Sequence, residues 1–436
     1  MSFEQIHHSE TAPKVAIVGA GFAGTKAAKT LAKSGAKVLL IDRHNYHTFI
    51  PMLYQVATAV LDPQQVVYPL RRLFRNYPNV RLLQATVKEV DFTHQLIYTE
   101  RAVIDYDYLI LATGSQSQYL GVSGAPEYAL PMRTLPEAIT IRNHILSCCE
   151  QAVQTTKEDE RQQLLTFVIV GGGPTGVELA GALRELVHGP LQRDYPELDF
   201  AQARVILLQA GEQLLKSYPQ RLGDYTTKWL RRHGVKVHLQ SRVSQVTPDT
   251  IYLEDGEVIL TKTVIWTAGV VAATPQTQEP LATGSSNKIQ VTPTLQVADQ
   301  PGVYAVGDLA QVENIAESLN GVAQEAIQQG KAAAENILRQ CQGKVGLPFR
   351  YEDKGRLAII SRHAGVGQIG KSAFTGFLAW FLWLAVHLRY LPGIRNRLGV
   401  LFNWLKCYFL GEGTVRLILK PAASKGVKEG AKKEKL

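Results

Sequence analysis

Short, wholly apolar runs alternate with segments of helical periodicity along most of the chain. The apolar runs predict buried strands, and they lie at 14–18, 38–41, 109–111, 167–170, 204–208 and 303–306. Residues 22–34 and 177–183, each just beyond one of these runs, have the spacing of helices. This alternation of strands and helices predicts an α/β fold.

The pattern changes near the C-terminus. Residues 377–388 form an apolar run of 12 residues, about 18 Å of helix against a hydrocarbon core of about 30 Å, so this run is too short to span a bilayer. Beyond Arg389 and Pro392, apolar residues recur at helical spacing with basic and polar residues on the other faces, which predicts an amphipathic helix lying in a membrane surface. These residues are Ile394, Leu398, Leu401, Phe402, Leu405 and Phe409. A dimer interface is the alternative use of the same face.

Length and composition fit two ordinary domains with an appendage. The chain has 436 residues, 45% of them hydrophobic, with 36 glycines. The N-terminal segment lacks the apolar stretch of a secretory signal, so we expect a reducing compartment. Four cysteines without a C-x-x-C pair argue against a redox-active disulfide and against a metal site.

Net charge is +9, and residues 420–436 hold six lysines against two glutamates. Because this tail follows the apolar region, anionic lipid is the expected partner and no nucleic acid is expected. A merely solubilising tail remains open.

A glycine-rich loop follows the first apolar run. Gly19, Gly21 and Gly24 form a G-x-G-x-x-G pattern between a strand and a helix, and Asp42 ends the next strand 18 residues beyond Gly24. Such glycines allow a tight turn and close approach of a pyrophosphate, while the acid can bind a ribose. The sequence therefore predicts a dinucleotide site here.

A second loop repeats the pattern. Gly171, Gly173 and Gly176 follow the strand at 167–170 and open the helix that contains Glu178. Two Rossmann-like units in one chain indicate one resident cofactor and one exchanging nucleotide, and flavin with nicotinamide is the natural pair.

Two further strand ends support this interpretation. Ala112, Thr113 and Gly114 allow the backbone to turn tightly beside a cofactor, and Asp308 after Gly307 can bond a flavin ribityl hydroxyl. Each alone could be a simple strand-terminating turn.

Together these motifs resemble the two-dinucleotide-binding-domain flavoproteins and, within them, the type II NAD(P)H:quinone oxidoreductases. The stretches 42–58, 323–330 and 376–410 look like the flavin-side, quinone-site and membrane-anchoring segments of that family. The resemblance implies FAD held by residues 12–118 and 285–345, an NAD(P)H domain inserted at 119–284, a membrane-anchoring region at 346–412, and a strand with a basic disordered tail at 413–436. It implies a peripheral, monotopic protein on the cytoplasmic face of a membrane, a homodimer, and electron transfer to a membrane quinone without proton pumping.

The resemblance also assigns site residues. The FAD set is Gly19, Gly21, Phe22, Ala23, Gly24, Asp42, Arg43, Tyr54, Val87, Ala112, Thr113, Gly114, Gly307, Asp308, Ala323 and Gln324. The NAD(P)H set is Gly171, Gly173, Pro174, Thr175, Gly176, Glu178, Gln209, Ala268 and Gly269.

Three polar residues are the predicted catalytic set. Glu178 is the carboxylate expected nearest the nicotinamide, although an exposed glutamate favourable to the helix dipole explains it equally well. Gln324 and Gln328 lie four positions apart, so a helix presents both amides on one face, where they could meet a quinone carbonyl. Two solvated glutamines are the simpler interpretation.

Gln209 departs from the pattern of NADH-using relatives, which have an acid at the end of this strand. A carboxylate about 4 Å from a 2′-phosphate would cost roughly 4 kcal/mol at an effective dielectric near 20, about a thousandfold in affinity. The neutral amide predicts that NADPH is accepted. A glutamine that simply bonds the ribose of NADH is the alternative.

Other functions on this scaffold are less consistent with the residues. A sulfide:quinone oxidoreductase or a disulfide reductase needs cysteines beside the flavin, and Cys148, Cys149, Cys341 and Cys407 do not fall at such motif positions. A non-enzymatic flavin-bearing redox sensor stays open because binding motifs do not report turnover.

Overall fold

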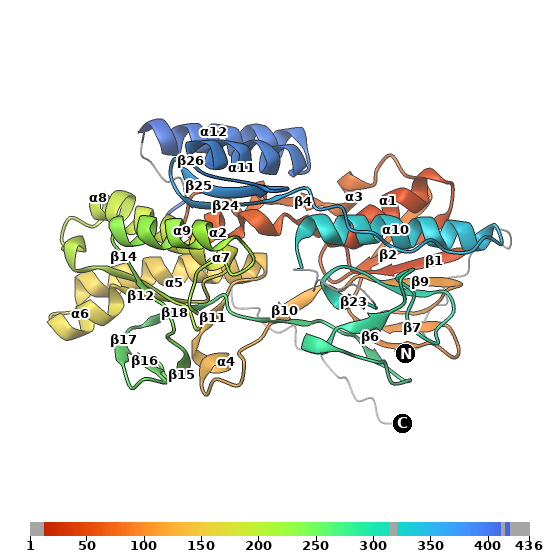
Figure 1. Ribbon diagram of the computed structural model, residues 1–436, viewed down its shortest axis with the longest axis horizontal. Coiled ribbons are helices and arrows are strands. Elements are labelled where there is room, and N and C mark those ends of the chain that lie inside the picture. Colours follow the sequence, from red (N-terminus) through yellow and green to blue (C-terminus); the bar gives the residue numbers. More distant parts are fainter. Residues whose placement is uncertain (1–12, 314–320, 411–414, 419–436) are drawn as a thin grey trace, which may run out of the picture.

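The computed structural model describes residues 13–313, 321–410 and 415–418. The first unit is built on a five-stranded parallel sheet in the order β22-β9-β1-β2-β5 (Figure 1). Its strands are β1 (Lys14–Val18), β2 (Lys37–Asp42), β5 (Val80–Gln84), β9 (Tyr108–Leu111) and β22 (Val303–Ala305). Because they are parallel, all their carboxyl ends, with the glycine loop after β1, meet at one edge of the sheet.

Two helices pack side by side on this sheet, α1 (Phe22–Lys33) and α10 (Ala323–Cys341). Their backbones approach so closely at Gly330 that a Cβ there would lie 2.2 Å from the carbonyl oxygen of Ala23. Below the sheet in Figure 1 lies a smaller one, β20-β6-β7-β8. It comprises β6 (Val87–Asp91), β7 (Leu96–Thr99), β8 (Val103–Asp105) and β20 (Gln276–Thr277).

The second unit repeats the architecture, with the parallel order β11-β18-β12-β13-β14. The strands are β11 (Leu130–Pro131), β12 (Thr166–Val170), β13 (Arg204–Leu208), β14 (Val235–His238) and β18 (Thr263–Trp266). Its main helices are α5 (Leu135–Gln154), α6 (Glu158–Leu164), α7 (Pro174–Leu186) and α9 (Gln220–Arg232), and an antiparallel meander comprises β15 (Val243–Val246), β16 (Thr250–Leu253) and β17 (Val258–Leu260).

Two antiparallel strands, β10 (Ser115–Ser117) and β19 (Val270–Ala272), connect the units. The second unit therefore lies in the chain between β9 and β22 of the first. Strand β20 already pairs with β6 of the first unit, so the return connection lies earlier than residue 285.

The C-terminal region begins with an antiparallel sheet of β24 (Arg356–Ser361), β25 (Ala364–Ile369) and β26 (Ser372–Gly376). It packs on α7, where a Cβ on Gly181 would lie 1.6 Å from the carbonyl oxygen of Ile360. Helices α11 (Phe377–Tyr390) and α12 (Ile394–Leu410) follow, at the two predicted positions.

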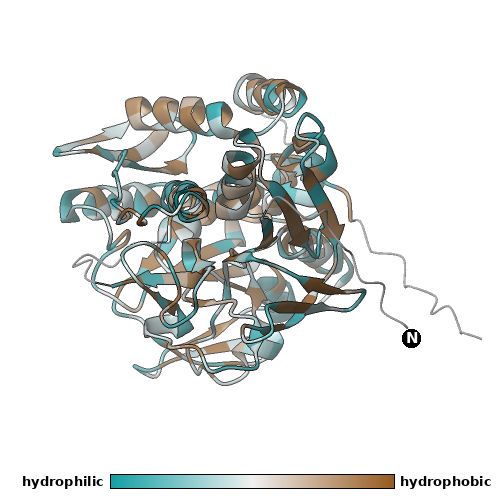
Figure 2. Cartoon of the chain, turned by 90° about the vertical axis from the view of Figure 1, so that its right-hand side faces the viewer, coloured by the Kyte–Doolittle hydropathy of each residue, from teal (hydrophilic) through white to brown (hydrophobic). Residues whose placement is uncertain are grey.

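These two helices form the top of the molecule, where hydrophobic segments lie at the surface (Figure 2). The exposed large apolar side chains there are Phe377, Leu378, Phe381, Val386, Tyr390, Ile394, Leu398, Leu401, Phe402 and Leu405; we call this set the apolar face. Within the described ranges, neither α11 nor any other helix combines the length and apolar character that crossing a bilayer requires. Most of the predicted C-terminal strand and basic tail lies outside the described residues, and the described part, 415–418, forms no strand.

Short elements join the larger ones. They are β3 (Tyr46–Thr48), α2 (Leu53–Ala57), β4 (Val67–Pro69), α3 (Leu70–Leu73), α4 (Ala125–Tyr128), α8 (Gln192–Asp194), β21 (Ile289–Val291) and β23 (Ala310–Val312).

Candidate active site

The first glycine loop is shaped by steric contacts at two of its glycines and by open space at the third. Gly19 has a φ of +104°, and a Cβ there would lie 2.3 Å from the carbonyl oxygen of Ala112. A Cβ on Gly24 would lie 1.8 Å from the carbonyl oxygen of Gly19, whereas one on Gly21 would meet nothing within 4 Å. Helix α1 begins there, at Phe22, without a side-chain cap or an acid in its first turn, so its amides can bind a pyrophosphate.

The second loop has the same geometry. Gly171 has a φ of +113°, and its Cβ would lie 2.8 Å from the amide nitrogen of Ala268. A Cβ on Gly176 would lie 1.8 Å from the carbonyl oxygen of Gly171, and Gly173 again faces open space. Helix α7, which begins at Pro174, also has no side-chain cap and no acid in its first turn. Both loops fit a dinucleotide.

The polar residues that end β2 and follow β13 support their loops in equivalent ways. Asp42 Oδ2 accepts a hydrogen bond from the backbone of Ala20 at 2.6 Å, and Gln209 Oε1 accepts one from the backbone of Gly172 at 2.9 Å. Each side chain thus orders a loop while keeping further hydrogen-bonding capacity for a ribose. Arg43 is exposed next to Asp42.

The strand ends predicted to flank a flavin come together around Asp308. Its Oδ2 accepts a hydrogen bond from Ser115 Oγ at 2.7 Å and pairs with Arg133. Thr113 Oγ1 is buried without a hydrogen-bond partner among the described residues. An orphaned hydroxyl beside the first glycine loop is consistent with an additional polar group, such as the flavin ribityl chain, at this position.

Arg133 is a site residue that the sequence interpretation missed. Its backbone amide bonds Glu137 Oε2 at 2.7 Å, within the capping box that starts α5, and its guanidinium contacts both Ser115 and Asp308. The sequence indicates the helix cap next to Arg133, but it does not indicate the contact with Asp308, 175 residues away.

Glu178 is buried, so its interpretation as an exposed helix-start glutamate is wrong. Its Oε1 accepts hydrogen bonds from Trp383 Nε1 at 3.1 Å and from the backbone of Ile359 at 3.3 Å. Burial raises the pKa of the Glu178 carboxyl to about 8, against the lowering effect of these two bonds. Tyr54 on α2 is also buried, and burial together with the Glu178 charge raises its pKa.

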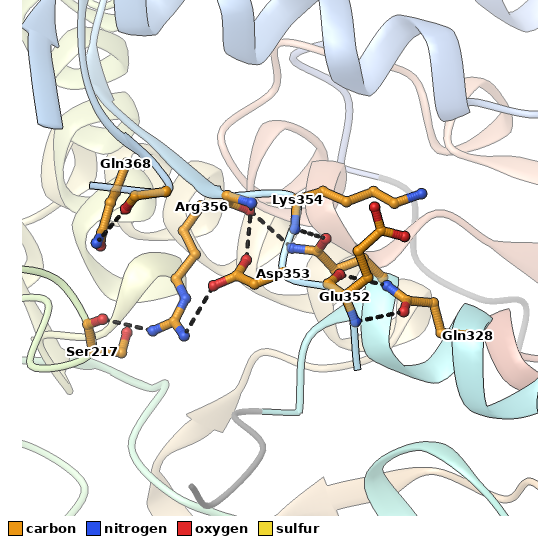
Figure 3. A network of polar contacts seen from close by, with 10 residues as sticks. Ser217, Gln328, Glu352, Asp353, Lys354, Arg356 and Gln368 are labelled. Carbon is orange, nitrogen blue, oxygen red and sulfur yellow. Dashed lines mark hydrogen bonds and ion pairs between the residues drawn. The ribbon is translucent and has the colours of Figure 1, made fainter. Parts of the chain in front are cut away.

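Gln324 and Gln328 project from one side of α10, as predicted, but they are not free solvated amides. Gln328 exchanges two hydrogen bonds with the backbone of Glu352, at 2.9 and 3.0 Å (Figure 3). Gln324 Nε2 donates to the carbonyl of Gly355 at 2.9 Å, and its Oε1 accepts from the amide of Lys354 at 3.3 Å.

The segment 352–356 continues this network into the second unit. Arg356 donates a hydrogen bond to the carbonyl of Ser217 at 2.7 Å and pairs with Asp353 at 3.6 Å (Figure 3). The two glutamines thus hold the connection that reaches the C-terminal sheet.

The remaining predicted contacts are Val87, Ala323, Ala268 and Gly269. Val87 begins β6, two residues after Ala85, whose amide bonds the carbonyl of Asp42 at 3.0 Å. Ala323 begins α10. Ala268 and Gly269 follow β18, and the amide nitrogen of Ala268 lies against Gly171 of the second loop.

Three of the four cysteines are buried. Cys148 and Cys149 are buried in α5, and burial raises the pKa of their thiols to about 11 and about 12. Cys341 is exposed at the end of α10, and Cys407 is buried in α12. The two buried α5 thiols are therefore poor nucleophiles.

Two parallel sheets with matched glycine loops define a class of protein. The family model described as pyridine nucleotide-disulphide oxidoreductase matches residues 13–330, and the chain belongs to that class.

Within it, the chain belongs to the type II NADH:quinone oxidoreductase family, which confirms the resemblance seen in the motifs. It is 35% and 37% identical to two type II NADH:quinone oxidoreductases of Mycobacterium tuberculosis, over 90% of this chain and 87% and 86% of theirs. Its fold is similar to that of NDH2 from Plasmodium falciparum in complex with NADH, with a TM-score of 0.87, 19% identity, and coverage of 94% of this chain and 100% of that one.

Proposed function

We propose that this chain is a membrane-associated enzyme that transfers a hydride from NADH or NADPH to FAD, and two electrons on to a membrane quinone, without proton pumping. The matched pair of glycine loops carries this proposal, because each loop has the geometry of a dinucleotide site, and two such sites in one chain suit a flavin and a nicotinamide. FAD, when bound, supplies the centre that accepts a hydride and gives up two electrons.

The proposed role of the chain's own residues is to bind FAD and NADH and to orient them. The amides at the start of α1 would bind the pyrophosphate of FAD, and Asp308 and Thr113 would bind its ribityl chain. The second loop and the start of α7 would hold the pyrophosphate of NADH in the same way. Positioning supplies most of the rate, since hydride transfer needs reacting atoms about 3 to 3.5 Å apart and no protein acid.

Gln209 supports acceptance of NADPH as well as NADH. With its Oε1 bonded to Gly172, its Nε2 remains a donor for a ribose hydroxyl or a 2′-phosphate. Gln209→Glu should lower the NADPH/NADH ratio of kcat/KM by about tenfold or more. Gln192→Glu, an exposed change on α8, is the control. An unchanged ratio in Gln209→Glu would contradict the assignment.

Glu178, proposed to lie nearest the nicotinamide, is a buried carboxyl whose pKa burial raises to about 8. The proposed contact with the acceptor falls to Gln324. Gln324 uses one N–H of its amide on Gly355, which leaves the second for a quinone carbonyl. Gln324→Leu should raise the KM for quinone several-fold and leave the rate of flavin reduction by NADH unchanged. A loss confined to flavin reduction would remove Gln324 from the quinone site.

The apolar face is the proposed membrane contact, on the cytoplasmic side. Each of its side chains contributes about 1.5 to 3 kcal/mol when buried. Replacing Phe381, Leu398 and Phe402 with glutamine should release the protein from phosphatidylcholine vesicles. Val258→Gln with Leu260→Gln, exposed on β17, is the control. A dimer lost in the triple variant while vesicle binding persists would make this face a subunit interface instead.

A further inference from the structure

We propose that four arginines on the first unit bind the headgroups of anionic phospholipids. Arg71 and Arg72 lie on α3, Arg75 follows it, and Arg81 lies on β5; we call this set the arginine patch. The inference rests on the proposed membrane attachment and adds a second, electrostatic contact that the first unit makes.

The arginine patch carries uncompensated charge. All four side chains are exposed, and none of them pairs with a carboxylate within 4 Å among the described residues. Residues 63–88 contain these arginines and Lys88, and they contain no aspartate or glutamate. Like charges this close repel, so an anion that bridges them is stabilised.

The arginine patch also surrounds a hollow. A depression of about 440 Å³ is lined by Arg71, Arg75 and Arg81, with Phe74 and Tyr77 among its other walls. Guanidinium groups bind phosphate oxygens in pairs, and an apolar wall suits the glycerol and upper acyl carbons next to a lipid phosphate. The depression is therefore suited to a headgroup.

The arginine patch is structurally continuous with the apolar face. The guanidinium of Arg72 lies 5.7 Å from the centre of the Tyr68 ring. Tyr68 in turn packs against Gly393, where a Cβ would lie 2.2 Å from the ring. Asn396 Nδ2 donates to the carbonyl of Val67 at 2.7 Å, which holds the start of α12 beside β4.

This continuity favours a lipid over a nucleic acid. Helix α3 lies on the same upper side of the molecule as α12 (Figure 1), and Ile394 and Leu398 at the start of α12 are 68% and 59% exposed. A surface that buries apolar side chains among acyl chains places neighbouring cations at the level of the phosphates, where each gains about fivefold in partitioning to an anionic membrane.

The test is flotation of the FAD-loaded full chain with phosphatidylcholine vesicles, with and without phosphatidylglycerol. The variant is Arg71→Gln, Arg72→Gln and Arg75→Gln together. The control removes the same charge at Arg101, Lys157 and Arg204, which are exposed and lie outside α3, α11 and α12. Flavin reduction by NADH, unchanged in both, shows that the proteins are folded.

We expect the wild type and the control to bind phosphatidylglycerol vesicles at least about tenfold more tightly than the patch variant, with a steeper loss of binding as salt rises. Binding to phosphatidylcholine alone should be the same in all three. Equal loss in the variant and the control overturns the arginine patch as a site but leaves membrane attachment standing. A wild type that binds neither vesicle overturns both, and patch-dependent binding to duplex DNA with unchanged vesicle binding reassigns the partner.

Discussion

The indole Nε1 of Trp383 donates a hydrogen bond to Oε1 of Glu178 across 3.1 Å. It joins α11, one of the two helices of the apolar face, to a buried carboxyl on α7 of the second unit. A parallel contact joins α12 to the first unit, where Trp404 Nε1 donates to Gln55 Oε1 at 2.8 Å. The C-terminal helices thus brace both nucleotide units.

Glu178 should make stability fall as pH rises. Its folded pKa of about 8 lies above the ordinary 4.5, so between these values the folded state holds a proton that the unfolded state has lost. The contribution of Glu178 to the free energy of unfolding is therefore fully present below pH 4.5. It is lost as the pH rises toward 8, by at most about 1.4 kcal/mol per pH unit. Glu178→Gln keeps an acceptor for Trp383 and should flatten this slope.

Denaturant unfolding at pH 5.5 and at pH 8 measures the difference. Glu197→Gln, an exposed change, should retain the wild-type slope. Identical slopes in the wild type and Glu178→Gln would mean that Glu178 ionises normally.

The open space at the middle glycine of each loop predicts that FAD binding and NADH binding can be impaired separately. A methyl group on Gly21 or Gly173 meets no protein atom within 4 Å, so both variants should fold. Gly21→Ala blocks the pyrophosphate of FAD and should yield protein depleted of flavin. Gly173→Ala should keep FAD but raise the Kd for NADH by at least about tenfold. Absorbance spectra and titrations measure both, and flavin loss in Gly173→Ala instead would contradict the assignment of the loops.

Replacing Arg142 with an apolar residue should stabilise the folded protein. Its side chain on α5 is fully buried, and its Nε, Nη1 and Nη2 have no hydrogen-bond partner among the described residues. Burial lowers the pKa of Arg142, because the charged guanidinium is less stable away from water. Arg142→Met should raise the free energy of unfolding by about 1 to 4 kcal/mol. A decrease of similar size would show that a counter-ion occupies the site.

The sequence was sufficient for features that depend on neighbouring residues. The glycine loops at Gly19 and Gly171 and the helices that follow them were predictable because spacing along the chain determines the turn and the helix start. The burial of Glu178 was not, since it depends on Trp383, 205 residues away. Gln324 and Gln328 were placed on one side of a helix, but their backbone partners at 352–355 come from a connection without periodicity.

The most direct test of the central claim is anaerobic single-turnover kinetics of the purified protein. We predict that NADH bleaches the flavin absorbance in one step, and that a short-chain quinone added afterwards restores it at a rate sufficient for steady-state turnover. A flavin that NADH reduces but quinone does not reoxidise would contradict the proposed reaction and leave a nucleotide-binding redox sensor as the function.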